Sequence, residues 1–255
     1  MMRAREELAV FLLAVQFLTR WPIRSQDLFT EARLTAATRY HPLVGALVGA
    51  FSGVVFWLAY LVFPVSLAIV LATAASILAT GAFHEDGFAD ACDGLGGGTT
   101  RERVLEIMRD SRLGTYGAAG LGLMLAAKVL ALAATPPEAI PWLLIAAHAA
   151  SRSSAVLAIA TGTYVRGSGI ARPVADSVAP GSLVIALATG AAAVCVLLAV
   201  ATPATILAGC GGLAAGHLVM RLLYERKLGG YTGDCLGAVQ QTGELGMYLG
   251  VAAAM

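Results

Sequence analysis

Apolar and polar stretches alternate along the chain, and the apolar stretches are long. Seven runs of mostly apolar residues follow one another, at 42–63, 65–83, 116–135, 139–160, 182–201, 203–224 and 235–254. A helix needs about 20 such residues to cross the hydrocarbon core of a bilayer. The pattern therefore predicts an all-α fold, namely a polytopic integral membrane helical bundle with about seven transmembrane helices.

The first apolar stretch, from Leu8 to Leu18, is too short to belong to this series. It is bounded by charged residues, with Glu6 and Glu7 on one side and Arg20 on the other. A run of this length is more typical of an interfacial or re-entrant helix than of a helix that spans the bilayer. It also lacks a small-residue cleavage site, so we do not interpret it as a signal peptide.

Lysine and arginine are concentrated on one side of the predicted bundle. Of the 17 basic residues, 15 lie in the segments 1–7, 19–41, 84–115, 161–181 and 225–234 with the adjoining Arg221. The alternate connections contain no lysine or arginine, at 63–64, 135–138 and 202–203. Because cytoplasmic loops carry the excess of these residues, the segregation predicts that the amino terminus and the basic loops are cytoplasmic and that the carboxyl terminus is outside.

The composition narrows the class of protein. Hydrophobic residues make up 58% of the 255 residues and charged residues only 13%, whereas the usual charged share is about 25%. A soluble protein with so little charge could not cover its own surface. This excludes a disordered chain, a nucleic-acid-binding basic domain and an ordinary cytosolic enzyme. No linker divides the chain, and we expect one membrane-embedded domain over 1–255 with a cytoplasmic acidic loop at 84–115.

An acidic segment follows the second apolar run. If a helix continues there, Asp86, Asp90 and Asp93 occupy positions i, i+4 and i+7 and fall within about 60° of each other on one face. Such carboxylates repel one another. Mg²⁺ would remove the repulsion, since it prefers oxygen ligands and is held by a few carboxylates together with substrate phosphates. Gly87 and Gly94 flank the acids and leave room for a bulky ligand. We therefore expect a Mg²⁺ site here, with a solvated acidic helix end as the alternative.

Ionisable groups inside the apolar runs are candidates for function, because they are expensive in a membrane. Arg152 lies within the fourth run, and Gln240 and Glu244 share one face of the last run. These residues either contact substrate or form an internal polar lock, such as a Glu244–Arg152 pair. Lys128 is left out of the site, because a lysine there more often snorkels or pairs. Asp234 either caps a helix or joins the metal site.

Several strings of residues together resemble the cobalamin synthase family. They are His84-Glu85-Asp86-Gly87-Phe88-Ala89-Asp90 with Asp93 to Gly98, Glu106 to Thr115, Gln16 to Pro22, Tyr40 to Gly45, and Gly233 to Ala238 with Gln240, Gln241 and Glu244. The resemblance covers nearly the whole chain. It implies a Mg²⁺-dependent transferase of the bacterial or archaeal inner membrane. This enzyme would join adenosylcobinamide-GDP to α-ribazole, or to α-ribazole 5′-phosphate, and release GMP. The oligomeric state stays open, a homo-oligomer included.

The resemblance also implies roles for individual residues. The expected Mg²⁺ ligands are Asp86, Asp90, Asp93 and Asp110. The candidate substrate-binding residues are Arg109, Ser111, Arg112, Arg152, Asp234, Gln240 and Glu244. His84, or one of the aspartates, would take the proton of the acceptor hydroxyl. Arg109 and Arg112 would hold phosphate through bidentate hydrogen bonds, and snorkelling to lipid phosphate is the alternative for both.

Two other classes fit the sequence less well. The core from Asp86 to Asp93, Asp-Gly-x-x-Asp-x-x-Asp, also looks like the motif of CDP-alcohol phosphotransferases. It departs from that motif because the Ala-Arg pair and the later acidic spacing are missing. A small transporter would distribute charged residues toward both faces and would show repeat symmetry, whereas the acids here gather on one side. Both comparisons favour the cobalamin enzyme.

Overall fold

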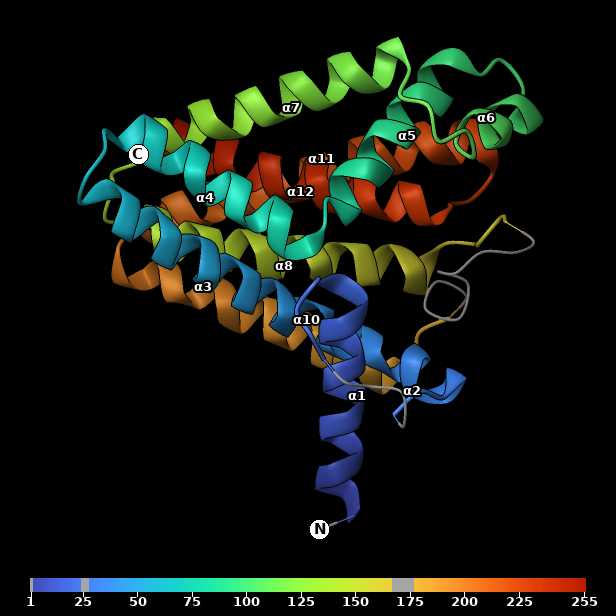
Figure 1. The fold of residues 1–255 in the computed structure, drawn as a ribbon, viewed down its shortest axis with the longest axis horizontal. Helices are drawn as coiled ribbons and strands as arrows, with labels where there is room; N and C mark the ends of the chain where they lie inside the picture. The colour runs from blue at the N-terminus through green and yellow to red at the C-terminus, as the bar shows by residue number, and fades with distance from the viewer. Residues whose placement is uncertain (1, 24–27, 167–176) are drawn as a thin grey trace.

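The computed structural model describes residues 2–23, 28–166 and 177–255, and within these ranges it contains helices and no β-strand (Figure 1). This confirms the predicted all-α fold. The helices in chain order are α1 (Met2–Leu18), α2 (Glu31–Ala36), η1 (Ala37–Tyr40), α3 (His41–Tyr60), α4 (Val65–Thr80), α5 (Phe83–Gly97), α6 (Arg101–Ile107), α7 (Thr115–Ala133), α8 (Ile140–Thr161), α10 (Pro180–Cys195), η2 (Val196–Ala199), α11 (Pro203–Leu228) and α12 (Gly233–Ala254). The middle of the predicted basic loop 161–181 and residues 24–27 of segment 19–41 lie outside the described residues.

All seven predicted apolar runs form helices, and most of these helices are long and apolar enough to cross a membrane. Five helices meet both criteria, namely α7, α8, α11, α10 with η2, and α3 with α2 and η1. The pair α4 and α5 meets them together but is bent by 91°, so the described residues hold up to six candidate spans. By length and composition, the chain is therefore a multi-pass membrane protein.

The last predicted span, α12, has the length of a transmembrane helix but is not among these candidates. The reason is its polar residues Gln240, Gln241 and Glu244, which lower its hydropathy. All three side chains are buried, with exposed fractions of at most 3%. They therefore face neighbouring helices and not lipid, and α12 is a polar helix inside an apolar bundle.

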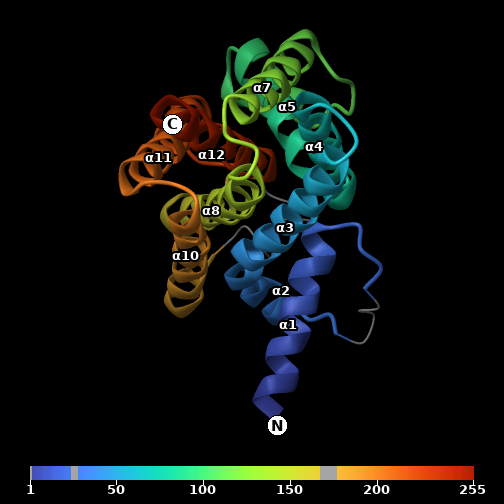
Figure 2. The ribbon, with the colours of Figure 1, turned by 90° about the vertical axis from the view of Figure 1, so that its left-hand side faces the viewer.

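The bundle is arranged around α8. Of the residues in its apolar window, 78% are buried, against 17% in α11. Figures 1 and 2 show the long helices side by side, with α8 packed against α3, α10 and α12. The helix α1 runs crosswise to them (Figure 1) and packs through Val10 and Ala14 against Val44 of α3. This orientation fits the prediction that α1 does not span the membrane.

A sharp bend between α4 and α5 turns the acidic segment away from the direction of α4. Gly81 ends α4 with φ +66°, and Ala82 follows with φ +58°. Both values lie in the left-handed region, which glycine adopts freely and alanine rarely. A non-glycine residue in this region persists only where the surrounding structure holds it. The strained Ala82 lies directly before the acidic motif and fixes the direction in which α5 leaves.

Glycines allow α11 and α12 to approach each other closely. Gly212 lies against Gly246, Gly216 against Thr242, and Gly250 against Ala208. Lipid provides no hydrophobic drive between transmembrane helices, so small residues that permit close van der Waals contact are the usual means of association. These three contacts hold α12, and with it the polar side chains that it carries, in place.

Replacing Gly212 with Ala should therefore destabilise the bundle, because the added methyl group would lie 2.8 Å from the carbonyl carbon of Gly246. We expect a loss of about 1–3 kcal/mol, as for other overpacked interiors, measured as a lower midpoint of unfolding in detergent. Gly211, the preceding residue of the same helix, is the matched control. Nothing lies within 4 Å of a methyl group added there, so Gly211→Ala should be neutral or stabilising through helix propensity. Equal melting temperatures for the two variants would contradict this packing.

Candidate active site

The acidic helix α5 crosses the start of α12 at two glycines. A methyl group added to Gly87 would lie 3.1 Å from the Cα atom of Asp234, and one added to Gly237 would lie 3.1 Å from the carbonyl oxygen of His84. Because neither glycine has a side chain, the two backbones approach closely. The crossing brings residues that lie about 150 positions apart in the sequence to one place.

Three carboxylates gather beside this crossing. Asp86 is exposed, Asp90 is half-buried, and Asp234 lies in the first turn of α12. The charges of Asp86 and Asp234 both act on Asp90, and Asp86 also acts on Asp234. Two of the predicted Mg²⁺ ligands therefore lie together. Asp234, whose role the sequence left open, joins them.

Arg166 is the positively charged partner of this cluster. Its Nη2 atom lies 2.7 Å from Oδ2 of Asp234 and donates to the carbonyl oxygen of Met108 at 3.1 Å. Its charge also acts on Asp90. The backbone positions it, because Val165 N donates to the carbonyl oxygen of Tyr231 at 3.0 Å, just before α12 begins. Apart from its location in a basic loop, nothing around Arg166 in the sequence indicates this role.

Asp93 holds the start of α7. One of its carboxylate oxygens accepts a hydrogen bond from the backbone N–H of Gly114 at 2.7 Å, and the other accepts one from Gly117 at 2.8 Å. The first N–H groups of a helix lack partners within the helix, and a carboxylate at this position is favoured by the helix dipole. The structure thus ties α5 to α7 through Asp93. Its predicted role as a metal ligand stays a prediction.

Asp110, the fourth predicted Mg²⁺ ligand, is engaged with Arg112. The guanidinium Nη2 donates to Oδ2 of Asp110 at 2.5 Å, and Nε donates to Oδ1 at 2.9 Å. These hydrogen bonds lower the pKa of Asp110 to about 2. Arg112 and Asp110 line an open surface pocket of about 480 Å³. Arg109 and Ser111, also predicted to bind substrate, are exposed in the same loop.

The residues fit a Mg²⁺ ion only together with substrate. Among the residues that the structure describes, no group of three or more His, Cys, Asp or Glu side chains is placed to hold a metal ion by itself. Mg²⁺ is, however, commonly bound by one or two carboxylates plus substrate phosphates. Asp86 and Asp90 are such a pair, and a bound cation would relieve the repulsion between their two negative charges.

Gln240 and Glu244, predicted to bind substrate, lie in a buried polar network. Lys128 Nζ lies 2.8 Å from Oε1 of Glu244, and Gln240 Nε2 donates to Oε2 of Glu244 at 2.7 Å. The network reaches the acidic helix, because Gln241 Nε2 donates to Oε1 of Glu85 at 2.9 Å. An internal lock was the alternative left open by the sequence, but its direct ion pair is Lys128–Glu244 and not Arg152–Glu244.

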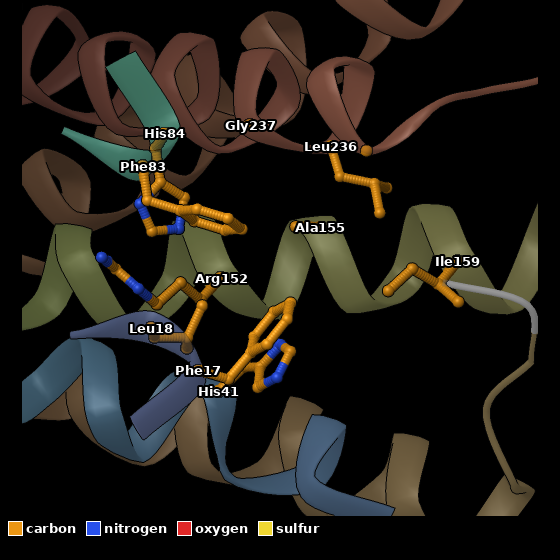
Figure 3. Close-up of a pocket in the computed structure, with 11 residues that line it drawn as sticks. Phe17, Leu18, His41, Phe83, His84, Arg152, Ala155, Ile159, Leu236 and Gly237 are labelled. Atoms are coloured by element: carbon orange, nitrogen blue, oxygen red, sulfur yellow. The ribbon is translucent and has the colours of Figure 1, made fainter. Parts of the chain in front are cut away.

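His84 and Arg152 converge on a cavity of about 60 Å³ (Figure 3). The cavity also receives the side chain of His41 from the start of α3, and Gly233 and Gly237 of α12 border it. His84 lies two residues before Asp86, and Asp234 lies between the two glycines. The cavity and the acidic cluster therefore meet the same helix crossing from different sides, because residues two apart on a helix do not share a face. Arg152 reaches the cavity from α8, 68 residues after His84 in the sequence.

The chain is similar along nearly its whole length to one family of known proteins. The sequence model of the family described as cobalamin-5-phosphate synthase matches residues 10–252. A protein of Leptothrix cholodnii named adenosylcobinamide-GDP ribazoletransferase is 43% identical over 251 residues, covering 96% of this chain and 95% of that protein. Proteins of the same name from Shewanella frigidimarina and Vibrio parahaemolyticus are each 41% identical, covering 95% and 96% of this chain and 94% and 92% of their own lengths. No solved structure matches.

Proposed function

The chain belongs to the cobalamin-5-phosphate synthase family of transferases, and we propose from this premise that it joins adenosylcobinamide-GDP to α-ribazole, or to α-ribazole 5′-phosphate, and releases GMP. The observation that carries the proposal is the gathering of Asp86, Asp90 and Asp234 around Arg166 in a chain that matches this family from residue 10 to residue 252. In a reaction at a diphosphate, carboxylates can bind a metal ion and an arginine can bind phosphate oxygens.

The reaction replaces one phosphorus–oxygen bond with another. The acceptor hydroxyl oxygen attacks the phosphorus on the cobinamide side of the diphosphate, the bond to the GMP moiety breaks, and the hydroxyl proton must be taken up. Phosphoryl transfer depends mainly on positioning and on neutralising charge. A Mg²⁺ ion bound at Asp86 and Asp90 would neutralise the diphosphate and stabilise GMP as the leaving group.

The protein's own residues supply the remaining parts. The guanidinium of Arg166 presents donors that match phosphate oxygens, and its ion pair with Asp234 holds it beside the acids. His84, which lines the cavity at the same helix crossing, would accept the hydroxyl proton on a ring nitrogen. Asp90, next to the same crossing, is the alternative base. Asp93 fixes the distance between α5 and α7 through its two amide hydrogen bonds.

We also propose that this site faces the cytoplasm, in the inner membrane of a bacterium or archaeon. The acidic cluster lies at the same end of the bundle as α6 (Figure 1), which carries Arg101 and Arg103. The opposite connections, at 63–64, 135–138 and 202–203, contain no lysine or arginine. An excess of basic residues marks the cytoplasmic side, where water-soluble nucleotides arrive.

The proposal is tested with the full chain purified into lipid vesicles and supplied with adenosylcobinamide-GDP, α-ribazole and Mg²⁺. We expect one GMP to be released for each corrinoid product, and no GMP when the acceptor is omitted. Parallel reactions with α-ribazole 5′-phosphate identify the preferred acceptor. Release of GMP without an acceptor would indicate hydrolysis, and absence of product from correctly folded protein would overturn the assignment.

A further inference from the structure

A groove on the outer surface of the bundle lies between α10 and α11, and α8 forms its floor. The helix α8 packs against both of them, and Figure 2 shows the two helices beside it. The groove has a volume of about 560 Å³. Leu187 of α10 and Leu218 of α11 line it and are 39% and 55% exposed. In a multi-pass membrane protein, such a groove opens toward the hydrocarbon of the bilayer.

The length of the groove corresponds to one leaflet of a bilayer. Its lining on α8 runs from Ala150 to Thr161, which is about 16 Å at 1.5 Å per residue. The hydrocarbon core is about 30 Å thick, so one acyl chain covers this length. Dividing the volume by the length gives a mean cross-section of about 35 Å², whereas a helix about 10 Å across occupies about 80 Å². The groove therefore accommodates a hydrocarbon chain better than a helix of a second subunit.

The hydroxyl groups inside the groove already have partners within the protein. Ser153 Oγ donates to the carbonyl oxygen of Ala186 at 3.0 Å, and Ser154 Oγ shares a hydrogen bond with Nδ1 of His217 at 2.7 Å. An apolar chain can lie against these hydroxyls without leaving them unpaired, which would otherwise be costly. The rest of the lining there is small or aliphatic, including Ala191 and Leu213. The interior of the groove therefore suits a hydrocarbon.

A guanidinium lies at one end of the groove, which is the end that we propose faces the cytoplasm. Arg221 Nε donates to Oε1 of Glu225 at 2.8 Å, Nη1 donates to Oγ1 of Thr161 at 2.5 Å, and Nη2 donates to the carbonyl oxygen of Thr161 at 3.0 Å. Arginine has five N–H donors, so these contacts in the described part of the chain use three. The side chain is 22% exposed. The further N–H groups on Nη1 and Nη2 suit phosphate oxygens.

We propose that this groove binds a phospholipid of the cytoplasmic leaflet, with one acyl chain between α10 and α11 and the phosphate at Arg221. An apolar length with a cation at its cytoplasmic end matches the two parts of a phospholipid, whereas free phosphate would match only the end. The site is built from α8, α10 and α11, whereas the acidic cluster lies on α5 and α12. The inference therefore goes beyond the proposed reaction and depends only on the chain spanning a membrane.

Filling the groove with a side chain tests where the acyl chain lies. Ala214 lines the groove from α11, and the next residue, Ala215, is equally exposed but lies outside the lining. Native mass spectrometry of the full chain in detergent, with added phosphatidylglycerol, counts the bound lipids. We expect Ala214→Phe to lose one tightly bound lipid that the wild type and the control Ala215→Phe retain. Ala191→Phe, with Ala192→Phe as its control, repeats the test from α10, where both residues are exposed and only Ala191 lines the groove.

Replacing Arg221 with Gln tests where the phosphate lies. The variant should bind phosphatidylglycerol about tenfold more weakly, because hydrogen bonds to a charged group are lost, and should bind diacylglycerol, which has no phosphate, as the wild type does. The control Arg226→Gln removes an exposed cation of the same helix and should leave both affinities unchanged. Added phosphatidylglycerol should also raise the midpoint of thermal unfolding of the wild type and of Ala215→Phe more than that of Ala214→Phe.

Three results would overturn the inference, and none of them depends on transferase activity. Equal lipid retention and equal thermal shifts for Ala214→Phe and Ala215→Phe would place the lipid elsewhere. Displacement of phosphatidylglycerol by inorganic phosphate, or wild-type affinities that are the same for phosphatidylglycerol and diacylglycerol, would remove the phospholipid from this site. A dimer of the wild type that Ala214→Phe abolishes would assign the groove to a second copy of the chain.

Discussion

Replacing Asp90 with Asn should reduce the rate of GMP release by about a hundred- to a thousand-fold, the range found when one electrostatic contact to a developing charge is removed. Asparagine keeps the shape of the side chain and removes its charge. Asp90 lies where the charges of Asp86, Asp234 and Arg166 all act on it. Removing this one charge therefore changes the electrostatics of the whole cluster. Single-turnover release of GMP from vesicles with saturating substrates measures the effect.

The Mg²⁺ dependence of the same variant tests whether Asp90 acts through the metal. We expect chelation of Mg²⁺ to stop the wild-type reaction, and Asp90→Asn to raise the Mg²⁺ concentration needed for half-maximal rate. The control Glu102→Gln also converts a carboxylate of the acidic loop into an amide, at an exposed position of α6. It should leave both the rate and the Mg²⁺ requirement unchanged. A normal rate for Asp90→Asn, or an unchanged Mg²⁺ requirement together with the lower rate, would remove Asp90 from the proposed metal site.

The transmembrane helices could be predicted from the sequence because their signal is local. A run of about 20 apolar residues predicts a helix wherever it occurs, and each predicted run is a helix in the structure. The helix α12 is the exception, because its buried glutamines lower its mean hydropathy below that of the candidate transmembrane helices. Hydropathy records what a side chain is, and it does not record whether that side chain faces lipid or another helix.

Only the part of the site that lies on a single helix could be predicted from the sequence. The spacing of Asp86, Asp90 and Asp93 places three acids on neighbouring positions of α5, but it does not reveal their distant partners. The two backbone amides that Asp93 accepts from belong to the start of α7, and Asp234 joins the acids only because Gly87 permits close approach of α12. Contacts of this kind depend on how helices pack, so neither Asp234 nor Arg166 could be assigned from spacing.

The role of Lys128 also could not be predicted from the sequence. A single lysine in an apolar run is compatible with snorkelling as well as with pairing, and the sequence contains no feature that decides between them. The structure buries its side chain, which is 4% exposed. Lys128 Nζ donates to Oε1 of Gln241 at 2.5 Å and lies 2.8 Å from Oε1 of Glu244. Pairing within the bundle is therefore the outcome, and the pair links α7 to α12.

Replacing Lys128 with Met should lower the free energy of unfolding by about 3–5 kcal/mol, because breaking a buried ion pair leaves an uncompensated charge behind. Methionine fills much of the same space, so the loss would come from Glu244, which is 3% exposed. Gln241 would lose a donor at the same time. Unfolding of the detergent-solubilised protein by a graded increase in sodium dodecyl sulfate, followed by circular dichroism, measures the change.

The double variant Lys128→Met with Glu244→Gln separates the charge from the packing. Gln240 and Tyr248 donate to different oxygens of Glu244, and the single amide oxygen of glutamine can keep one of these two hydrogen bonds. Because the substitution also removes the unpaired charge, the double variant should be more stable than Lys128→Met alone, and measuring Glu244→Gln as well completes the double-mutant cycle that gives the coupling energy. The control Arg103→Met breaks the ion pair with Glu106, whose side chains are 57% and 69% exposed, and should change stability by about 1 kcal/mol or less. If Lys128→Met destabilised the protein no more than Arg103→Met does, then Glu244 would find its compensation elsewhere, from Arg152 and His148, and the link between α7 and α12 would not stabilise the site.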